Sequence, residues 1–217
     1  MLLAEQTDIL AIIKANHEKF LNFNSVKQNN LYGLIKNDEV INALKIIPLL
    51  LHVNQPGLPG YIESKDTPFG ISGYTPTPKA YNYLYSLFPH IKLEEHNHPK
   101  SIQSLAMMGS GGTIAYTEQS DFDYWVCYYD DHINFEGLYL LKIKCKSIES
   151  WLYDTFNIEV HFYINSINKL QLNIFANDEE NLSGSSMGKL LKEEFFRSSI
   201  IIAGKIPFWW VVPVAHD

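Results

Sequence analysis

The sequence predicts a small α/β or α+β sheet domain preceded by helices, and we adopt the α+β form: a small mixed sheet flanked by helices. The chain has 217 residues, 46% of them hydrophobic and 19% charged, which is enough apolar surface for a packed core. Helical patterns cover separate segments of the first ninety positions, and from residue 102 onward short apolar runs alternate with helical patterns.

The net charge and the cysteine content argue against binding to duplex nucleic acid, a disulfide scaffold and a zinc cluster. The chain carries 17 basic and 24 acidic residues, a net charge of −7, so duplex nucleic acid is not an expected partner, because its binding depends on Lys and Arg neutralising phosphates. Cys127 and Cys145 are too few for a disulfide scaffold and too far apart in sequence for a zinc cluster, so reduced, buried thiols are expected. No signal peptide or membrane-length apolar run is present, which predicts a cytoplasmic protein without a membrane span.

Two helices are expected near the N-terminus. Residues 5–23 place apolar side chains at helical spacing and predict an amphipathic helix. Residues 37–52 predict a second helix, with Asn37 as N-cap and Pro48 distorting the last turn. The apolar positions of the first helix are Ile9, Leu10, Ile12, Ile13, Phe20 and Leu21.

The next region alternates between loops and a short helix. Residues 53–78 hold five prolines and four glycines, which predicts an irregular, rigid loop. Thr77 followed by Pro78 is typical of a helix start, and this helix is expected to end near Phe88. The His-x-His pair within residues 96–100 has no third ligand nearby, so a solvated loop is favoured over a metal site.

The remaining sequence predicts the sheet. We divide the chain into residues 1–95, N-terminal helices and loop packed on the core, and residues 96–217, the core itself, with one continuous domain as the alternative. The elements expected from residue 102 onward are strands over Ile102–Met108, Asp121–Tyr129 and Asn157–Asn165, helices over 135–156 and 186–204, and a final strand over Trp209–Val214.

Candidate catalytic residues follow the first predicted strand. Asp121 and Asp123 stand two apart in a strand, so both carboxylates project from one face and repel each other unless a cation lies between them. Oxygen ligands of this kind suit Mg²⁺. The Gly109-Ser110 turn can present N–H groups and a hydroxyl to a phosphate, and Glu159 on the third strand could complete a two-metal site.

Each of these signals is weak alone, but their order along the chain is specific. A strand, a Gly-Ser turn, ten intervening residues, Asp-x-Asp on a second strand, a helix and an acid on the next strand follow one another. This order resembles the nucleotidyltransferase superfamily that includes DNA polymerase β. The resemblance implies a polymerase-β-like nucleotidyltransferase fold for residues 96–217.

Several further blocks resemble the N-terminal catalytic region of the class I adenylate cyclases of gamma-proteobacteria. They lie in family order over about residues 40–213. The blocks are Leu58-Pro59-Gly60-Tyr61, Ser120-Asp121-Phe122-Asp123-Tyr124-Trp125-Val126-Cys127, Ile158-Glu159-Val160-His161-Phe162, Gly184-Ser185, Glu194-Phe195-Phe196-Arg197 and Ala203-Gly204-Lys205. The Trp-Val-Cys and Leu-Pro-Gly-Tyr blocks are distinctive of this family.

The resemblance also implies site residues and a cofactor, Mg²⁺ or Mn²⁺. Glu159 could be a metal ligand or a general base, and the sequence leaves both open. Arg197 also keeps two alternatives: it could bind a phosphate, or pair with an acid such as Glu194 three residues earlier. The implied metal-binding and catalytic residues are Asp121, Asp123 and Glu159, and the implied nucleotide-binding residues are Gly109, Ser110, Ser185, Arg197 and Lys205.

The implied activity is conversion of ATP to 3′,5′-cyclic AMP and pyrophosphate by two-metal catalysis. Two alternatives stay open: nucleotidyl transfer to a protein, small-molecule or RNA acceptor, and a truncated module that binds nucleotide without catalysis. Family members are much longer and carry a C-terminal region that responds to the sugar phosphotransferase system. Besides ATP, the expected partners are therefore such a regulatory region or a protein regulator.

Overall fold

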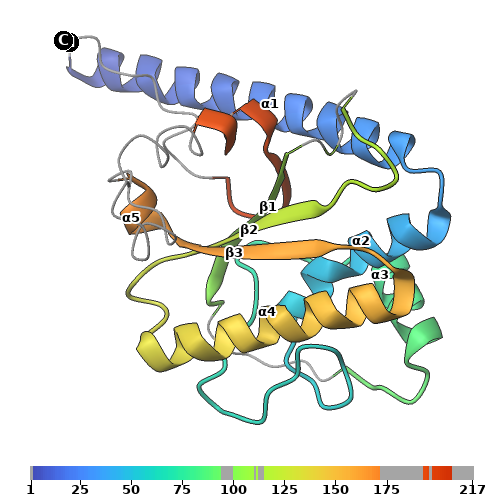
Figure 1. Ribbon diagram of the computed structural model, residues 1–217. Helices are drawn as coiled ribbons and strands as arrows, with labels where there is room; N and C mark the ends of the chain where they lie inside the picture. The colour runs from blue at the N-terminus through green and yellow to red at the C-terminus, as the bar shows by residue number, and fades with distance from the viewer. Residues whose placement is uncertain are drawn as a thin grey trace, which may run out of the picture.

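The computed structural model describes residues 2–93, 100–109, 111, 115–171, 193–195 and 197–206 (Figure 1). A mixed sheet lies at the centre, α1 runs along one side of the molecule, and α2, α3 and α4 lie together on another. The elements in chain order are α1 Leu2–Leu34, α2 Asp38–His52, α3 Pro78–Leu87, β1 Ile102–Met108, β2 Phe122–Tyr128, α4 Phe135–Phe156, β3 Val160–Ser166, α5 Ile167–Gln171 and β4 Ile200–Gly204.

The sheet has four strands in the order β3-β2-β1-β4. β2 and β3 pair in parallel, with α4 as the connection between them, whereas β1 pairs antiparallel with both β2 and β4. The predicted α+β class with a small mixed sheet is confirmed. So are the predicted strands at β1, β2 and β3, although β2 and β3 begin one and three residues later than expected.

Side-chain caps fix where the predicted helices begin. The Asn37 side chain accepts a hydrogen bond from the Glu39 N–H, and the Thr77 side chain accepts one from the Ala80 N–H. Both caps were predicted, and α4 has the predicted bounds. Pro48 lies inside α2 and is buried there.

α1 is longer than predicted, and its apolar face is largely uncovered. The helix spans 33 residues instead of 5–23. Leu10 is 67% exposed and Ile9 is 51% exposed, whereas Leu31, near the C-terminal end of the helix, is fully buried. The expectation that one face of residues 5–23 packs on the core is therefore wrong for most of that face, because only the second half of the helix lies against the described part of the sheet.

The second half of α1 covers the outer edge of β4. The Asn24 amide accepts from the Ile201 N–H at 2.7 Å and donates to the Ile201 carbonyl at 2.9 Å, as a neighbouring strand would. Lys27 Nζ donates to the carbonyls of Arg197 and Ser199 at 2.8 and 3.2 Å. An edge strand leaves unpaired backbone groups, and these contacts satisfy several of them.

β4 corrects the predicted helix over 186–204. Residues 186–192 lie outside the described residues, a short helical stretch covers 193–198 except position 196, and Ile200–Gly204 is a strand that pairs with β1. Three consecutive isoleucines open this strand, and such a short apolar run fits a buried strand as well as a buried helix. The predicted strand over Trp209–Val214 and the His-x-His pair also lie outside the described residues.

The two faces of the sheet have separate cores. The larger cluster joins α2, α3 and α4 to one face, and so draws side chains from both predicted parts of the chain. The smaller cluster covers the other face, where Trp125 stacks on Phe195 with ring centroids 4.2 Å apart. Cys127 and Cys145 are free and buried, as predicted. No helix in the described ranges combines the length and apolar content of a membrane span, and the cytoplasmic location stays a prediction.

Candidate active site

The predicted acids gather where β2 and β3 begin. Asp121 directly precedes β2, Asp123 is its second residue, and Glu159 directly precedes β3. The two strands are parallel neighbours, so their starting ends meet at the same end of the sheet, and Asp123 is the register partner of His161. The structure thus brings the three predicted acids together.

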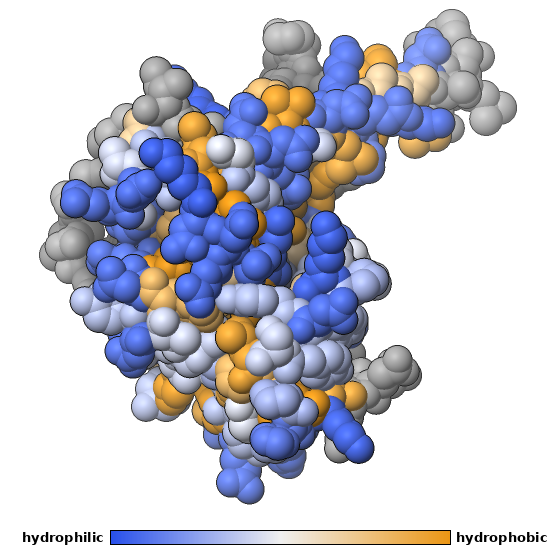
Figure 2. All heavy atoms as spheres, turned by 90° about the vertical axis from the view of Figure 1, so that its right-hand side faces the viewer, coloured by the Kyte–Doolittle hydropathy of each residue, from blue (hydrophilic) through white to orange (hydrophobic). Residues whose placement is uncertain are grey.

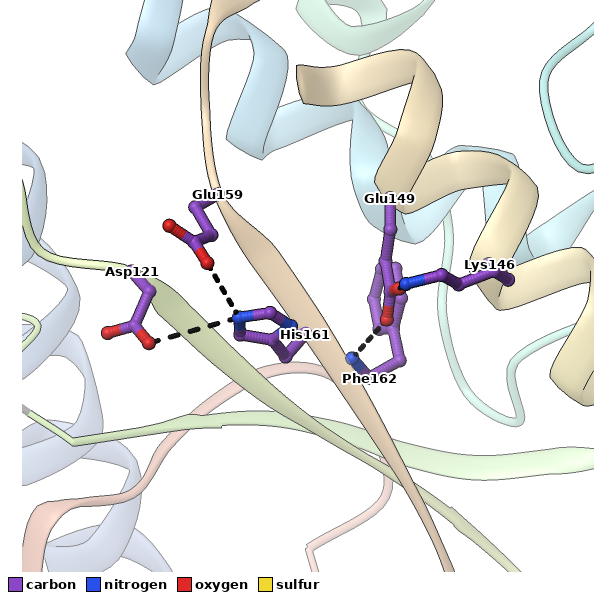
Figure 3. A network of polar contacts seen from close by, with 6 residues as sticks. All are labelled: Asp121, Lys146, Glu149, Glu159, His161 and Phe162. Atoms are coloured by element: carbon purple, nitrogen blue, oxygen red, sulfur yellow. Dashed lines mark hydrogen bonds and ion pairs between the residues drawn. The ribbon is translucent and has the colours of Figure 1, made fainter. Parts of the chain in front are cut away.

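A histidine lies between two of these acids (Figure 3). The Nε2 atom of His161 is 3.2 Å from Glu159 Oε1 and 4.0 Å from Asp121 Oδ2. Glu159, His161 and Tyr163 alternate along β3 and therefore share one face of the sheet. No role was predicted for His161, because its contact with Glu159 and Asp121 depends on the register between β2 and β3.

The Asp123 side chain is half-buried, and the described groups around it offset little of its negative charge. Its Oδ1 atom is buried and has no hydrogen-bond partner in the part of the chain that the structure describes. Burial raises the pKa of Asp123 above its ordinary value, the negative charges of Asp121, Glu194 and Glu159 raise it further, and His161 opposes them. A buried carboxylate oxygen without a donor is a position where a bound cation would lower the free energy.

Gly109 lies beside this carboxylate at the end of β1. Its φ of +91° is left-handed, which suits glycine, and a Cβ here would lie 3.9 Å from Asp123 Oδ2. The Gly109 N–H donates to Ser198 Oγ at 3.2 Å, and that hydroxyl donates to the Glu194 carbonyl at 2.9 Å. The predicted phosphate-binding turn is therefore next to the acids, but Ser110 itself lies outside the described residues, as does Ser185.

The stretch that carries Arg197 is fixed on the same side of the sheet. Phe195 anchors it to Trp125, and its Ser198 contact joins it to the end of β1. The Arg197 side chain is 82% exposed, and its Nη2 is 3.6 Å from Glu193 Oε2. This acid is one turn back at i−4, so the ion pair that the sequence left open forms with Glu193 rather than with Glu194.

Lys205 is not brought to the acids. Its backbone N–H donates to the Gln103 carbonyl near the start of β1, whereas Asp123 pairs with Met108 at the end of that strand. Met108 lies five residue steps along the strand from Gln103, a distance of about 17 Å. The expectation that Lys205 lies near the nucleotide phosphates is therefore not supported, and we leave it out of the candidate site.

The acids fit a divalent cation only in part. Within the described residues, no group of three or more His, Cys, Asp or Glu side chains is close enough together to hold a metal ion as it stands. Asp121 and Asp123 nevertheless supply oxygen atoms of the kind that Mg²⁺ prefers, and the unpartnered Asp123 Oδ1 is available to it. Glu159 is engaged by His161, so the aspartate pair is the better fit.

Comparison with known proteins identifies the family. The family model described as the adenylate cyclase NT domain matches residues 12–210, nearly the whole chain. The chain belongs to this family. The resemblance to class I adenylate cyclases is thereby confirmed, and all the candidate site residues lie within the matched range.

The curated relatives of this adenylate cyclase NT domain are adenylate cyclases. The proteins of Pasteurella multocida and Haemophilus influenzae are each 33% identical, over 180 and 192 residues, covering 79% and 80% of this chain and 21% and 22% of the relative. The Escherichia coli K12 protein is 32% identical over 175 residues, 79% of this chain and 20% of the relative. The chain thus spans about a fifth of the length of these relatives. No solved structure matches it.

Sequence reasoning missed the residues that hold this adenylate cyclase NT domain site together. Ser198 and Lys27 act through backbone groups that lie far away in sequence, and Glu194 was considered only as a partner for Arg197. Of these, only the electrostatic role of Glu194 had a sequence signal, because it stands in a family-like block. The Ser198 contact depends on how the stretch before β4 meets the end of β1, and the Lys27 contact depends on how α1 meets that stretch, which no local pattern encodes.

Proposed function

We propose that this chain is catalytic and converts ATP to 3′,5′-cyclic AMP and pyrophosphate. The acidic cluster at the starts of β2 and β3, in a chain whose relatives are named adenylate cyclases, carries the proposal. Asp123 has a buried oxygen without a hydrogen-bond partner among the described residues and a pKa raised by its surroundings, an arrangement that disfavours the folded protein unless it serves a bound cation.

Asp121 and Asp123 would hold Mg²⁺ or Mn²⁺. When bound, two such ions would lower the pKa of the ribose 3′-hydroxyl and neutralise charge at the α-phosphorus. The 3′-oxygen then attacks the α-phosphorus, a new O–P bond forms, and the bond to the pyrophosphate oxygen breaks. In this proposal the exposed guanidinium of Arg197 would receive the leaving pyrophosphate.

Glu159 has two possible roles, and its contact with His161 favours the general base. A carboxylate that hydrogen-bonds an imidazole 3.2 Å away is oriented and partly occupied, which suits proton acceptance better than metal ligation. In this arrangement the 3′-hydroxyl proton passes to Glu159, and His161 holds the carboxylate in position.

We also propose that the sheet and its helices form a polymerase-β-like nucleotidyltransferase fold. A polymerase-β-like nucleotidyltransferase fold would have the Gly-Ser turn after one strand, Asp-x-Asp on its neighbour and a third acid on the strand beyond a connecting helix. β1, β2, α4 and β3 follow this order, in the sheet order β3-β2-β1-β4. The regulatory region or regulator expected from the resemblance remains a prediction.

The product formed from labelled ATP tests the proposal. With Mg²⁺ present, free labelled cyclic AMP supports the cyclase, and label transferred to an added protein, RNA or small-molecule acceptor supports the transferase alternative. ATP binding without turnover supports the non-catalytic module. The double variant Asp121→Asn/Asp123→Asn is the control, and equal cyclic AMP formation by this variant and the unmodified chain would refute the metal-binding role of the aspartates.

A further inference from the structure

Two clefts open on either side of Glu159. The larger has a volume of about 520 Å³ and lies where α1 meets α2, opposite the C-terminal end of α4; we call it the corner cleft. Figure 2 shows the side of the molecule on which α1 meets α2, where hydrophobic side chains are interspersed among hydrophilic ones. The second cleft has a volume of about 460 Å³ and lies between α4 and the start of β3.

The lining of the corner cleft suits a flat, aromatic, hydrogen-bonding ligand. Four aromatic side chains line it, together with apolar side chains from residues 35 and 40. Gln119 and Asn157 supply amide groups, each of which can donate and accept hydrogen bonds, as the edge of a purine requires. Aromatic faces stack on nucleobases with useful affinity. The aromatic residues are Tyr116, Phe122, Tyr153 and Phe156.

The second cleft is a poorer fit to a base, because one tyrosine and no amide side chain line it, and it is a poor fit to a phosphate. It is lined by the carboxylates of Glu149, Asp154 and Glu159, which repel anions. Its Lys146 is already paired with Glu149 at 2.9 Å, and the other oxygen of Glu149 accepts from the Phe162 N–H at 2.8 Å (Figure 3). Of these two clefts, the corner cleft is therefore the one with the chemistry of a nucleoside site.

The corner cleft is continuous with the acidic cluster. Ser120 lines it and directly precedes Asp121, and Glu159 forms part of its wall. A base held there places the ribose and α-phosphorus at the starts of β2 and β3, and the remaining phosphates toward β1 and the Arg197 stretch. From β3 to β4 is three strand spacings, about 14 Å, a span that suits an extended nucleoside triphosphate.

We infer that the corner cleft binds the purine base of ATP. This inference rests on the proposed function, whose chemistry requires a bound nucleoside triphosphate at Asp121 and Asp123. It assigns the recognition of the base to residues outside the Asp-x-Asp strand, namely the 116–120 loop and the C-terminal end of α4.

The variant Gln119→Trp tests it by filling the corner cleft from an exposed loop position. Its matched control is Ser150→Trp, an exposed position in the second cleft. Dissociation constants are measured in Mg²⁺ for ATP and for inorganic tripolyphosphate, which lacks the base. Gln119→Trp is expected to weaken ATP binding roughly tenfold or more and to leave tripolyphosphate binding unchanged, while Ser150→Trp changes neither. Melting temperatures confirm that both variants fold.

A second variant keeps the test decisive if Gln119→Trp unfolds. Tyr153→Ala removes a partly exposed ring from the wall and should weaken ATP binding several-fold, again without effect on tripolyphosphate. Unchanged ATP affinity, or equal weakening of ATP and tripolyphosphate, overturns the inference, as does a chain that binds no ATP. Failure of the proposed function gives a different result: ATP binds and is blocked by Gln119→Trp, but no cyclic AMP is formed.

Discussion

Lys144 and Asp123 are both withdrawn from water, but their surroundings treat them differently. Lys144, in the middle of α4, is 1% exposed, and its ammonium donates to the carbonyls of Val53 and Gly60 at 2.8 and 3.0 Å. Asp123, at the start of β2, has a buried oxygen with no hydrogen-bond partner among the described residues and three acids nearby. The Lys144 ammonium therefore has hydrogen-bond acceptors within the protein, whereas the buried Asp123 oxygen has no donor among the described residues.

The difference separates a structural region from a functional one. Lys144 fastens the Pro/Gly-rich loop to α4, assisted by Ser147, whose hydroxyl accepts from the Gly60 N–H at 3.1 Å. Gly60 has a φ of +80°, and a Cβ there would lie 2.8 Å from Ile148, so the loop approaches α4 as closely as glycine allows. Among the described residues no hydrogen bond of this kind reaches Asp123 Oδ1, which fits the cation-binding role proposed for Asp123.

The largest effect is expected at Asp123. Asp123→Asn keeps the shape and removes the charge, so cyclic AMP formation should fall by about a thousandfold or more. The raised pKa means that the folded protein binds more protons than the unfolded chain above pH 3.8, so ionisation lowers the free energy of unfolding. The metal-free variant should therefore melt at or above the wild-type temperature at pH 7, which thermal denaturation measures.

Asp131→Asn is the matched control for that prediction. It removes the same charge from an exposed position after β2, where the carboxylate contacts only His132 at 3.9 Å in the described structure. Neither activity nor melting temperature should change much. Added Mg²⁺ should raise the melting temperature of wild type and Asp131→Asn but not that of Asp123→Asn. A clear loss of stability in Asp123→Asn would mean that Asp123 belongs with Lys144 as a structural charge.

At Lys144 the expected effect is on stability. Lys144→Met leaves two buried carbonyls without a donor, at about 1–3 kcal/mol each, and removes the cost of burying an ammonium, which offsets part of that loss. We expect a net decrease in the free energy of unfolding at pH 7 of about 1–3 kcal/mol, measured by urea denaturation, with turnover of the folded protein near wild type. Lost activity in a well-folded Lys144→Met protein would show that Lys144 also contributes to function and would contradict its assignment to the structural region.

The pH dependence of the same variant sharpens the assignment. Burial lowers the pKa of Lys144 from 10.5 to about 8. Between those values the unfolded chain binds more protons than the folded protein, so the contribution of Lys144 to stability rises as pH rises from about 8 to 10.5 and is constant below 8. The difference between wild type and Lys144→Met should grow over that window. Lys142→Met, an exposed lysine on the same helix, should give a difference that does not vary with pH.

Elements with strong local signals were predictable from the sequence. Asn37 and Thr77 cap helices because their side chains bond backbone groups two and three residues away, and this geometry is local. The shared face of Asp121 and Asp123 likewise follows from strand alternation. Such signals depend only on the helix or strand in which they lie and not on the rest of the fold.

Elements fixed by distant contacts were not predictable. The isoleucines of β4 fit a helix or a strand until β1 and Asn24 supply partners on its two edges. Lys205 was placed near the phosphates by its position in a family-like block, but β4 runs antiparallel to β1 and carries it away from the end where Asp123 lies. Contacts of this kind depend on strand direction and register, which a single sequence does not state.

The smallest expected effect concerns Arg197, a charge near the acidic cluster that stays in water. Its side chain is 82% exposed and lies 3.6 Å from Glu193, a pair that contributes little to stability. Arg197→Lys keeps the charge but loses the two-pronged contact with a phosphate, so ATP affinity should fall roughly three- to tenfold while the free energy of unfolding changes by no more than about 0.5 kcal/mol. Glu193→Gln frees the arginine from its partner and should leave ATP binding equal or slightly stronger.

Titration calorimetry and melting temperature on the same Arg197 samples decide between a phosphate-binding role and a solvated ion pair. Unchanged affinity in Arg197→Lys would remove the phosphate role and leave Arg197 as a solvated partner of Glu193, because an exposed charge with a nearby partner has, unlike Asp123, no unmet interaction for a ligand to supply.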